Sequence, residues 1–166
     1  MDLAIRPKIS RGTKKILPKL AAMQKGVYSH FIPEEPWTEK TALSFINYSF
    51  KKQPDLFFIA KDKKNIVGYT FGYVKPWADG NHLMLEEMVV DLPFQNKGIG
   101  TLLHKTLVEQ AINKYKITAV EATTYHGKDG MPMNWYEKLG WEKQDLFLIL
   151  ADPQKILNNL ASMLKK

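Results

Sequence analysis

Apolar and polar residues follow one another along this chain with two different periods. Helical spacing, in which apolar positions recur every three or four residues, appears in several separate stretches. The clearest stretch carries Ile99, Leu103 and Leu107 on one face, with polar residues opposite. The predicted helices are Thr13–Lys25, which Gly26 would end, a helix capped by Thr38 that reaches about Tyr48, Gly98–Tyr115, Met133–Leu139, and a last helix that begins at Pro153.

Shorter runs rich in β-branched and aromatic residues are typical of strands. Three of them follow one another, joined by polar turns at Lys61–Asn65 and Pro76–Asn81. The pair Asp79-Gly80 in the second turn indicates a hairpin. Three strands joined by tight turns make an antiparallel meander. The predicted strands are Asp2–Arg6, Asp55–Ala60, Ile66–Lys75, His82–Asp91, Thr118–Thr124 and Leu146–Leu150.

This order of elements predicts an α/β fold of the mixed α+β kind. We expect a mostly antiparallel central sheet with helices on both faces and an extra C-terminal helix. With 166 residues, one domain over residues 1–166 is the natural division. The last helix has an apolar face at Ile156, Leu157 and Leu160 that could close the core or pack on a second subunit. A homodimer is therefore one of two open alternatives.

Composition excludes several kinds of chemistry. The chain has no cysteine, which excludes disulfides, thiolate metal sites and a cysteine nucleophile. No apolar run approaches the ~20 residues of a membrane span, and the first residues lack a secretory signal, so we expect a cytoplasmic protein with no membrane partner. His30, His82 and His104 are scattered without ligand spacing, so we expect no metal.

The net charge of +7 would attract anions such as nucleic acids or phosphorylated cofactors. Only Arg6 and Arg11 among the 24 basic residues are arginine. Since reading of base edges favours the arginine fork, this composition argues against sequence-specific DNA binding.

The strongest local pattern is QNKGIG at Gln95–Gly100, between a predicted strand and an amphipathic helix. A helix N-terminus has unpaired N–H groups and a partial positive charge, so it attracts anions. Gly98 and Gly100 let phosphate oxygens approach the backbone, and Lys97 adds a positive charge. The loop suits a pyrophosphate. Neither a Walker loop nor a dinucleotide-binding fingerprint fits these residues.

A second pattern, WYEKLGW, ends at Trp141. Together with the strand LEEMVVDLPF and the loop QNKGIG, it resembles the GNAT superfamily of acyl-CoA-dependent N-acyltransferases. The detailed match runs from about Leu85 to Trp141, and residues 1–54 match in layout alone.

The resemblance implies acetyl-CoA as co-substrate. No nucleic-acid partner is expected, in line with the lysine-rich composition. In the family, the coenzyme pyrophosphate lies on the backbone of the loop, and the pantetheine arm runs beside the preceding strand. The positions that correspond to this binding site are Met88, Val89, Val90, Gln95, Asn96, Lys97, Gly98, Ile99, Gly100 and Thr101.

The same resemblance implies two catalytic residues. Glu86 lies nine residues before Gln95, where some members carry a general base, and it alternates with Met88 and Val90 along the strand. A bulge would exchange the faces of Glu86 and Glu87. Water or another group, such as His126, could replace the carboxylate. Tyr136 stands where the family has a general acid that would also contact the coenzyme sulfur.

Two features concern neighbouring binding sites. Where the family often has a cofactor-binding Asn, this chain has Asp129, which cannot donate through an amide, and Asn134 is off register. The predicted loop Tyr28–Trp37, between the first two helices, would border the acceptor site according to the same resemblance. Its aromatic and acidic residues would suit a cationic amine, although a plain surface loop is the alternative; they are Tyr28, Phe31, Glu34, Glu35 and Trp37.

We therefore expect an N-acetyltransferase that moves an acetyl group from acetyl-CoA directly to a primary amine in a ternary complex. The acceptor could be a polyamine, an amino acid, an aminoglycoside-like antibiotic or a protein amino group. The alternative is a non-catalytic acyl-CoA-binding sensor or subunit of the same fold. A basic nucleic-acid-binding protein is a third hypothesis, without a supporting aromatic-basic motif.

Overall fold

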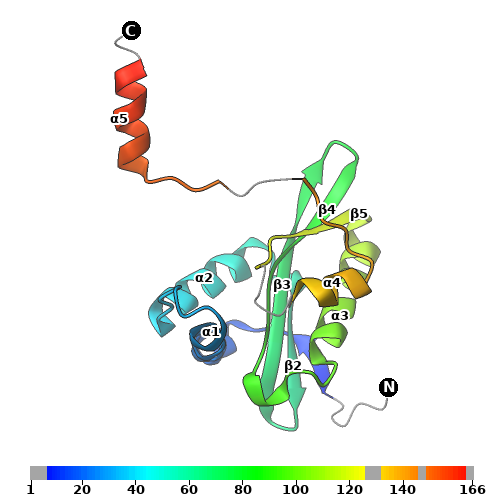
Figure 1. Cartoon of the computed structure of the whole chain (residues 1–166). Helices are drawn as coiled ribbons and strands as arrows, with labels where there is room; N and C mark the ends of the chain where they lie inside the picture. Colours follow the sequence, from blue (N-terminus) through cyan, green and yellow to red (C-terminus); the bar gives the residue numbers. More distant parts are fainter. Residues whose placement is uncertain (1–6, 126–131, 146–148, 164–166) are drawn as a thin grey trace. The chain divides into compact units, whose positions relative to one another are not determined.

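The computed structural model describes residues 7–125, 132–145 and 149–163. It divides the chain into two compact units, one ending at Thr123 and the other beginning at Thr124. The first unit contains the sheet and the long helices around it (Figure 1). The second contains two further helices. A single domain over residues 1–166 stays a prediction.

A five-stranded sheet forms the first unit. Its strands lie in the order of the sequence; the first three pairs are antiparallel and the last pair is parallel. The long hairpin of β3 and β4 runs through its middle (Figure 1). This architecture confirms the predicted mixed, mostly antiparallel sheet. The strands are β1 (Lys8–Arg11), β2 (Phe57–Asp62), β3 (Asn65–Trp77), β4 (Gly80–Val90) and β5 (Ile117–Ala122).

Helices cover both faces of this sheet, as predicted (Figure 1). The helices α1 (Leu17–Phe31) and α2 (Glu39–Lys52) lie on one face, and α3 (Ile99–Tyr115) lies on the other. Short 3₁₀ turns precede α1, β2 and the loop before α3; they are η1 (Lys14–Ile16), η2 (Pro54–Leu56) and η3 (Leu92–Phe94).

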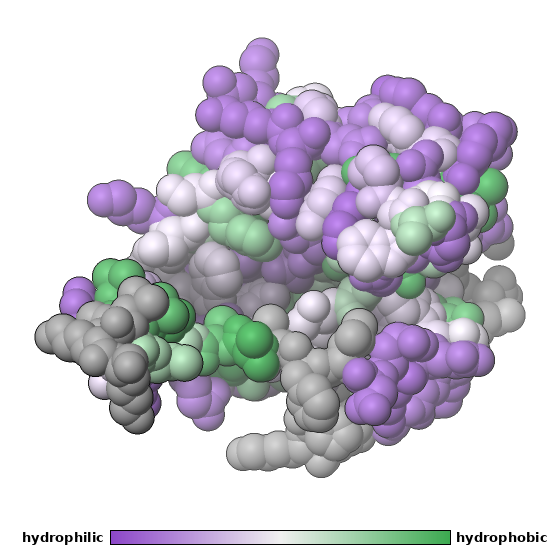
Figure 2. Space-filling view, turned by 90° about the horizontal axis from the view of Figure 1, so that it is seen from above, coloured by the Kyte–Doolittle hydropathy of each residue, from purple (hydrophilic) through white to green (hydrophobic). Residues whose placement is uncertain are grey.

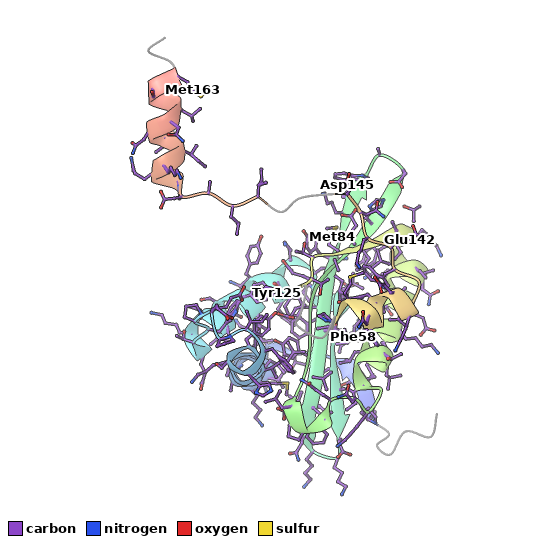
Figure 3. The ribbon with its side chains drawn as sticks, viewed as in Figure 1. Phe58, Met84, Tyr125, Glu142, Asp145 and Met163 are labelled. Atoms are coloured by element: carbon purple, nitrogen blue, oxygen red, sulfur yellow. The ribbon has the colours of Figure 1, made fainter. Side chains whose placement is uncertain are left out.

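The core under α1 and α2 is built from stacked aromatic rings. Phe57 stacks on Phe71 at 4.9 Å between ring centroids, and Tyr69 stacks on Phe71 at 5.9 Å. Leu20 and Ile46 from the two helices are fully buried in the same cluster. On the other face, Phe58 points toward α3 (Figure 3). Burial on both faces fixes β2 and β3 firmly in the middle of the first unit.

The first helix differs from the prediction at its end. Gly26 was expected to stop it, but α1 continues to Phe31. A glycine inside a helix costs about 1 kcal/mol relative to alanine. Here Val27 is buried and the hydroxyl of Tyr28 bonds Glu87, so tertiary contacts outweigh that cost. The predicted loop Tyr28–Trp37 is therefore wrong in its first turn.

The start of α2 confirms the predicted cap. The Oγ1 atom of Thr38 accepts a hydrogen bond from the Thr41 N–H at 3.1 Å. Oγ1 of Thr41 accepts one from the Thr38 N–H at 2.9 Å, which completes a capping box. The helix runs to Lys52, beyond the expected end near Tyr48.

The two terminal strands of the prediction lie wholly or partly outside the described residues. The predicted strand Asp2–Arg6 lies outside the described residues, and the first observed strand is β1, which pairs with Phe58–Lys61. Its sequence KISR has a single apolar residue and so shows no strand pattern of its own. The strand forms through its pairing with β2. Of the predicted strand Leu146–Leu150, residues 146–148 lie outside the described part. Ile149 and Leu150 are exposed and belong to no strand.

The second unit contains α4 (Met133–Lys138) and α5 (Pro153–Met163), close to the predicted helices. The extra C-terminal helix is therefore confirmed. The apolar side chains of α5 are exposed, among them Met163, labelled in Figure 3. Figure 2 shows a face on which hydrophilic and hydrophobic side chains alternate in patches.

Candidate active site

A β-bulge interrupts β4 at the predicted catalytic carboxylate. Phe71 pairs with Glu87 and Gly72 pairs with Leu85, so Glu86 has no residue opposite it on β3. Gly72 makes this possible, because a Cβ atom there would lie 2.5 Å from the carbonyl oxygen of Met84. A bulge bends the strand and redirects its side chains.

The bulge changes the face toward which the carboxylates point. Glu86 bonds Lys52 of α2 and Glu87 bonds Tyr28 of α1, so both carboxylates lie on the α1 and α2 side of the sheet. Met88 and Val90 lie on the α3 side, where each comes within 3.8 Å of the position that a Cβ of Gly100 would take. The alternation expected of Glu86 with Met88 and Val90 is therefore not found.

Glu87 is the most strongly perturbed acid of the described residues. Its side chain is buried, and its Oε2 accepts a hydrogen bond of 2.8 Å from the Tyr28 hydroxyl. The Oε1 atom accepts a bond of 2.9 Å from the Met88 N–H. Burial raises the pKa of Glu87 to about 7, and the negative charges of Glu35 and Glu86 add to this rise, whereas the two hydrogen bonds oppose it. The carboxyl group therefore changes its charge near neutral pH.

A second layer of polar groups supports Glu87. Gln24 of α1 is fully buried and donates from Nε2 to Oε2 of Glu87 at 3.5 Å. The Tyr69 hydroxyl in turn donates to Oε1 of Gln24 at 2.9 Å. Sequence reasoning missed Gln24, although a glutamine on the apolar face of a predicted helix is a signal that could have found it.

The predicted acceptor loop contributes some of its residues to this region. Trp37 contacts the Tyr28 ring edge to face at 5.6 Å, and its Nε1 donates to Oε2 of Glu35 at 2.7 Å. Phe31 and Glu34, in contrast, are exposed. Tyr28, Glu35 and Trp37 thus form an aromatic and acidic group beside Glu87.

The end of β4 presents backbone groups at an edge without a partner strand among the described residues. β5 pairs with Asn81–Leu85 and goes no further along β4. The Asp91 N–H donates to the Val67 carbonyl at 3.0 Å, and antiparallel alternation then turns the backbone groups of Met88 and Val90 away from β3. Nε2 of Gln95 donates to the Val90 carbonyl at 2.9 Å. Two groups on this edge, the Met88 N–H and the Val90 carbonyl, are thus bonded by side chains of the chain itself rather than by a strand.

The loop QNKGIG forms a turn that opens α3, as the sequence predicts. Asn96 and Gly98 have φ values of 59° and 78°, in the left-handed region. The Leu102 N–H bonds the Gly98 carbonyl at 3.1 Å as α3 begins. The amides of Ile99 and Gly100 precede this bond, so they have no partner inside the helix. Lys97 turns back, and its Nζ donates to the Pro93 carbonyl at 2.7 Å. Thr101 lies exposed in the first turn.

Tyr136, the predicted acid, lies in the second unit on α4 and is buried. Its ring contacts those of Trp135 and Trp141, each at 4.9 Å between centroids, with interplanar angles of 67° and 61°. The Trp141 N–H donates to the Tyr136 carbonyl at 3.1 Å. Asn134 is exposed on the same helix. Asp129 and His126 lie outside the described residues.

The described part of the chain contains neither a cluster of metal-ligating side chains nor a membrane-spanning helix. Residues 7–125, 132–145 and 149–163 contain no group of three His, Cys, Asp or Glu side chains that could hold a metal ion. No helix within these ranges has the length and apolar character needed to cross a membrane.

An open hollow of about 400 Å³ lies away from the bulge. It is lined by Lys19, Lys61 and Lys64 together with apolar side chains such as Ile16 and Phe94. None of the predicted site residues lines it.

Residues 23–141 match the sequence model of the "Acetyltransferase (GNAT) family". The chain belongs to this family. The match includes β4, the turn before α3 and the WYEKLGW pattern, the elements on which the resemblance was recognised. The GNAT resemblance inferred from the sequence is confirmed, and membership makes the chain an acyltransferase domain.

Solved structures agree with this GNAT fold. PH1933 from Pyrococcus horikoshii OT3 is 29% identical, with a TM-score of 0.70 over 87% of this chain and 94% of that one. The integron cassette protein VCH_CASS6 of V. cholerae is 15% identical, with a TM-score of 0.73 over 95% and 99%. Aminoglycoside N-acetyltransferase AAC(6')-Iy, solved in complex with CoA, is 15% identical, with a TM-score of 0.69 over 92% and 99%. No curated protein matches the chain.

Proposed function

We propose that this GNAT protein is an N-acetyltransferase that moves the acetyl group of acetyl-CoA directly to a primary amine in a ternary complex. The observation that carries the proposal is the pairing of two features on one strand-turn-helix unit. The end of β4 has no partner strand beyond Leu85 among the described residues, and in the turn after it the amides of Ile99 and Gly100 have no partner inside α3. An extended thiol arm and a diphosphate are the ligands that fit such an edge and such a turn.

Coenzyme binding follows from these features. We assign the diphosphate to the amides between Gln95 and Thr101, where Gly98 provides the left-handed turn and Gly100 leaves the backbone open. The pantetheine arm would add to the edge of β4 at Met88–Val90 like a short extra strand. A related fold, AAC(6')-Iy, is solved both with CoA and with a CoA-linked bisubstrate analogue, which supports this assignment.

The acetyl-transfer step needs a proton acceptor for the amine. We assign this role to Glu86, since its side chain is only half-buried and a ligand can reach it from the α2 side. Glu87 is the neighbouring alternative, with a pKa of about 7 that suits proton transfer at neutral pH. Its buried position and its bond from Tyr28 favour a supporting role in shaping the acceptor site with Glu35 and Trp37.

The departing thiolate needs a proton donor, and we assign this role to Tyr136. The support is the WYEKLGW pattern, in which α4 places this tyrosine between two tryptophans. Oxyanion stabilisation would come from the backbone N–H of Val90, since the alternation of the antiparallel pair turns the Val89 N–H toward β3. The absence of cysteine excludes a thioester intermediate on this chain, in keeping with direct transfer.

The experiment is a free-thiol release assay with acetyl-CoA and a panel of polyamines, amino acids, aminoglycosides and lysine peptides. We expect thiol release with at least one amine and saturable coenzyme binding by calorimetry. Tyr136→Phe should lower turnover by about 10²–10⁴-fold while the coenzyme dissociation constant stays within about twofold. Tyr115→Phe, which removes a hydroxyl bonded to Asp55, is the matched control and should keep full turnover.

The outcomes separate the alternatives. Coenzyme binding without thiol release for any amine would make the chain an acyl-CoA-binding sensor or subunit. No coenzyme binding at all would contradict both readings of the site.

A further inference from the structure

A lysine ammonium lies in a small cage of aromatic and acidic groups beside the bulge. Nζ of Lys52 is 3.7 Å from the centroid of the Tyr73 ring and 4.8 Å from that of Tyr48. The same Nζ donates to Oε1 of Glu86 at 3.2 Å. Two rings and one carboxylate thus surround a single primary ammonium. We call Tyr48, Tyr73 and Glu86 the ammonium cage.

The cage comes from three elements that the fold holds rigidly. Tyr48 lies on the last turns of α2, Tyr73 on β3, and Glu86 on the bulge of β4. Met84, labelled in Figure 3 and opposite Tyr73 in the sheet, marks the part of β4 just before the bulge. Because the cage needs the bulge to turn Glu86 toward α2, its geometry depends on the same feature that ends regular pairing on β4.

The chemistry of the cage matches a protonated amine. Aromatic faces attract a cation, and a carboxylate accepts a hydrogen bond from it. Burial works against the charge on Lys52, but the hydrogen bond and charge of Glu86, and then the two tyrosines, together raise its pKa above the usual value. The cage therefore stabilises an alkylammonium ion in the charged state.

The ion pair is not needed to hold the fold together. Both partners are partly exposed, with 28% of the Lys52 side chain and 20% of the Glu86 side chain accessible. Exposed pairs contribute little to stability. The end of α2 is fixed separately, since the Val74 N–H donates to Oε1 of Gln53 at 2.8 Å. The Lys52 side chain can thus leave the cage by rotation while the helix stays in place.

We propose that the ammonium cage is the subsite for a primary alkylammonium group of the acceptor, and that Lys52 occupies it until the acceptor displaces it. That the occupant is the acceptor amine rests on the proposed function, in which Glu86 accepts the proton of this amine. The acceptor then carries a primary amine at the end of a flexible alkyl chain. A polyamine and a lysine side chain share this chemistry.

The test measures amine binding by calorimetry in the absence of acetyl-CoA. Cadaverine and spermidine represent polyamines, and Nα-acetyl-lysine N-methylamide represents a protein lysine. Lys52→Met keeps an apolar side chain of similar length but empties the cage of its cation. Lys51→Met is the matched control, since it removes a neighbouring exposed lysine of the same helix end.

We expect Lys52→Met to bind at least one of these amines about tenfold more tightly than the wild type does, and Lys51→Met to bind it as the wild type does. The gain should disappear in the double variant Lys52→Met/Glu86→Gln. The amine class that shows the gain identifies the source of the acceptor. Equal affinity of Lys52→Met and Lys51→Met for every amine would overturn the proposal.

A second measurement on the wild type covers the case in which Lys52→Met does not fold. The rings of Tyr73 and Tyr48 should shift the Lys52 ε-methylene proton resonances upfield. Saturation with the amine should move them to the values of a solvent-exposed lysine, and unchanged resonances at saturation would contradict displacement.

Failure of the proposed function has a different signature. Tighter amine binding by Lys52→Met without any thiol release would leave the cage intact as a binding site and reject catalysis. Thiol release with equal KM for the amine in both proteins would retain catalysis and reject the cage.

Discussion

The hydroxyl of Tyr28 donates a hydrogen bond of 2.8 Å to Oε2 of Glu87, and this bond joins the last turn of α1 to the bulged part of β4. The two residues are far apart in the sequence. The bond explains both why α1 continues past Gly26 and how a buried carboxyl is held in place. The bond stabilises the charged form of the Glu87 carboxyl, whereas burial favours the neutral form.

Replacing Tyr28 by phenylalanine should therefore raise the pKa of Glu87 further above its value of about 7. A charge-assisted hydrogen bond of this kind is worth a rise of about one pKa unit. The measurement is a ¹³C NMR titration of the glutamate carboxyl carbons in Tyr28→Phe and wild type. Tyr115→Phe removes a hydroxyl bonded to Asp55 and should leave the Glu87 titration unchanged. A Glu87 pKa that falls in Tyr28→Phe would contradict the assigned bond.

Glu87 should also make the stability of the wild type depend on pH. In the folded chain its carboxyl keeps its proton up to about pH 7, whereas in the unfolded chain it releases it near its usual value of 4.5. The folded state binds more protons within this window, so the Glu87 contribution to the free energy of unfolding falls as pH rises through it. The loss amounts to at most about 3.5 kcal/mol, at ~1.4 kcal/mol for each pKa unit.

Glu87→Gln removes this titration. Urea unfolding of both proteins at pH 5 and pH 8 should show that the variant gains stability relative to the wild type at the higher pH. A stability difference between the two proteins that is the same at both pH values would refute the raised pKa.

The fold was accessible from the sequence because most elements carry their own signals. The Asp79-Gly80 turn, the Thr38 cap and the stripe of Ile99, Leu103 and Leu107 each act within a few residues. The end of α1 was not accessible, because the contact that extends it comes from Glu87 on β4, which is distant in the sequence. The low helix propensity of a glycine is a local property, and it gives no information about a tertiary hydrogen bond.

The site was accessible in part for the same reason. The turn Gln95–Gly100 is a local motif, whereas the bulge at Glu86 is a mismatch between two strands, and LEEMVV alone gives no sign of it. Gly72 on the opposite strand is the one sequence signal for it, because a side chain there would collide with the Met84 carbonyl. Lys52 meets Glu86 through topology alone, and no pattern within α2 predicts that contact.

The two glycines of the turn before α3 should respond differently to alanine. Gly98 has a φ of 78°, so Gly98→Ala should cost about 1–2 kcal/mol in the free energy of unfolding. At Gly100 a Cβ would meet its nearest atoms at an ordinary contact distance of 3.8 Å, and alanine suits a helix. Gly100→Ala should therefore be at least as stable as wild type in urea unfolding. Equal losses in both variants would show that the turn does not need the left-handed conformation.

Thr38 offers a test of the capping box. Thr38→Ala removes the oxygen that accepts the Thr41 N–H and should lower the free energy of unfolding by about 1 kcal/mol. Thr38→Ser keeps an oxygen in the same place and should retain most of that stability. Urea unfolding of the two variants side by side measures the difference, and an alanine variant as stable as the serine variant would exclude a role for the cap.

His82 should act as a pH-dependent clamp between the hairpin and β5. Its Nε2 lies 2.7 Å from Oδ1 of Asp79 in the β3–β4 turn, and its Nδ1 contacts Oε1 of Glu121 on β5. The bond with Glu121 raises the pKa of His82 above its usual value of 6.5; burial opposes the rise and Asp79 supports it. The stabilisation is then fully present below about pH 6.5 and disappears as pH rises through the raised pKa.

An NMR titration of the His82 ring protons should accordingly give a pKa above 6.5, and Glu121→Gln should bring it back toward that value. Asp79→Asn should have the smaller effect, because the Asp79 carboxylate is 64% exposed and water screens it. Amide exchange along β5, corrected for its intrinsic rise with pH, should also accelerate above the raised pKa in the wild type, because the deprotonated imidazole can no longer donate to both carboxylates. A His82 pKa at or below 6.5 would exclude the clamp, because the two carboxylates would then not be stabilising the imidazolium.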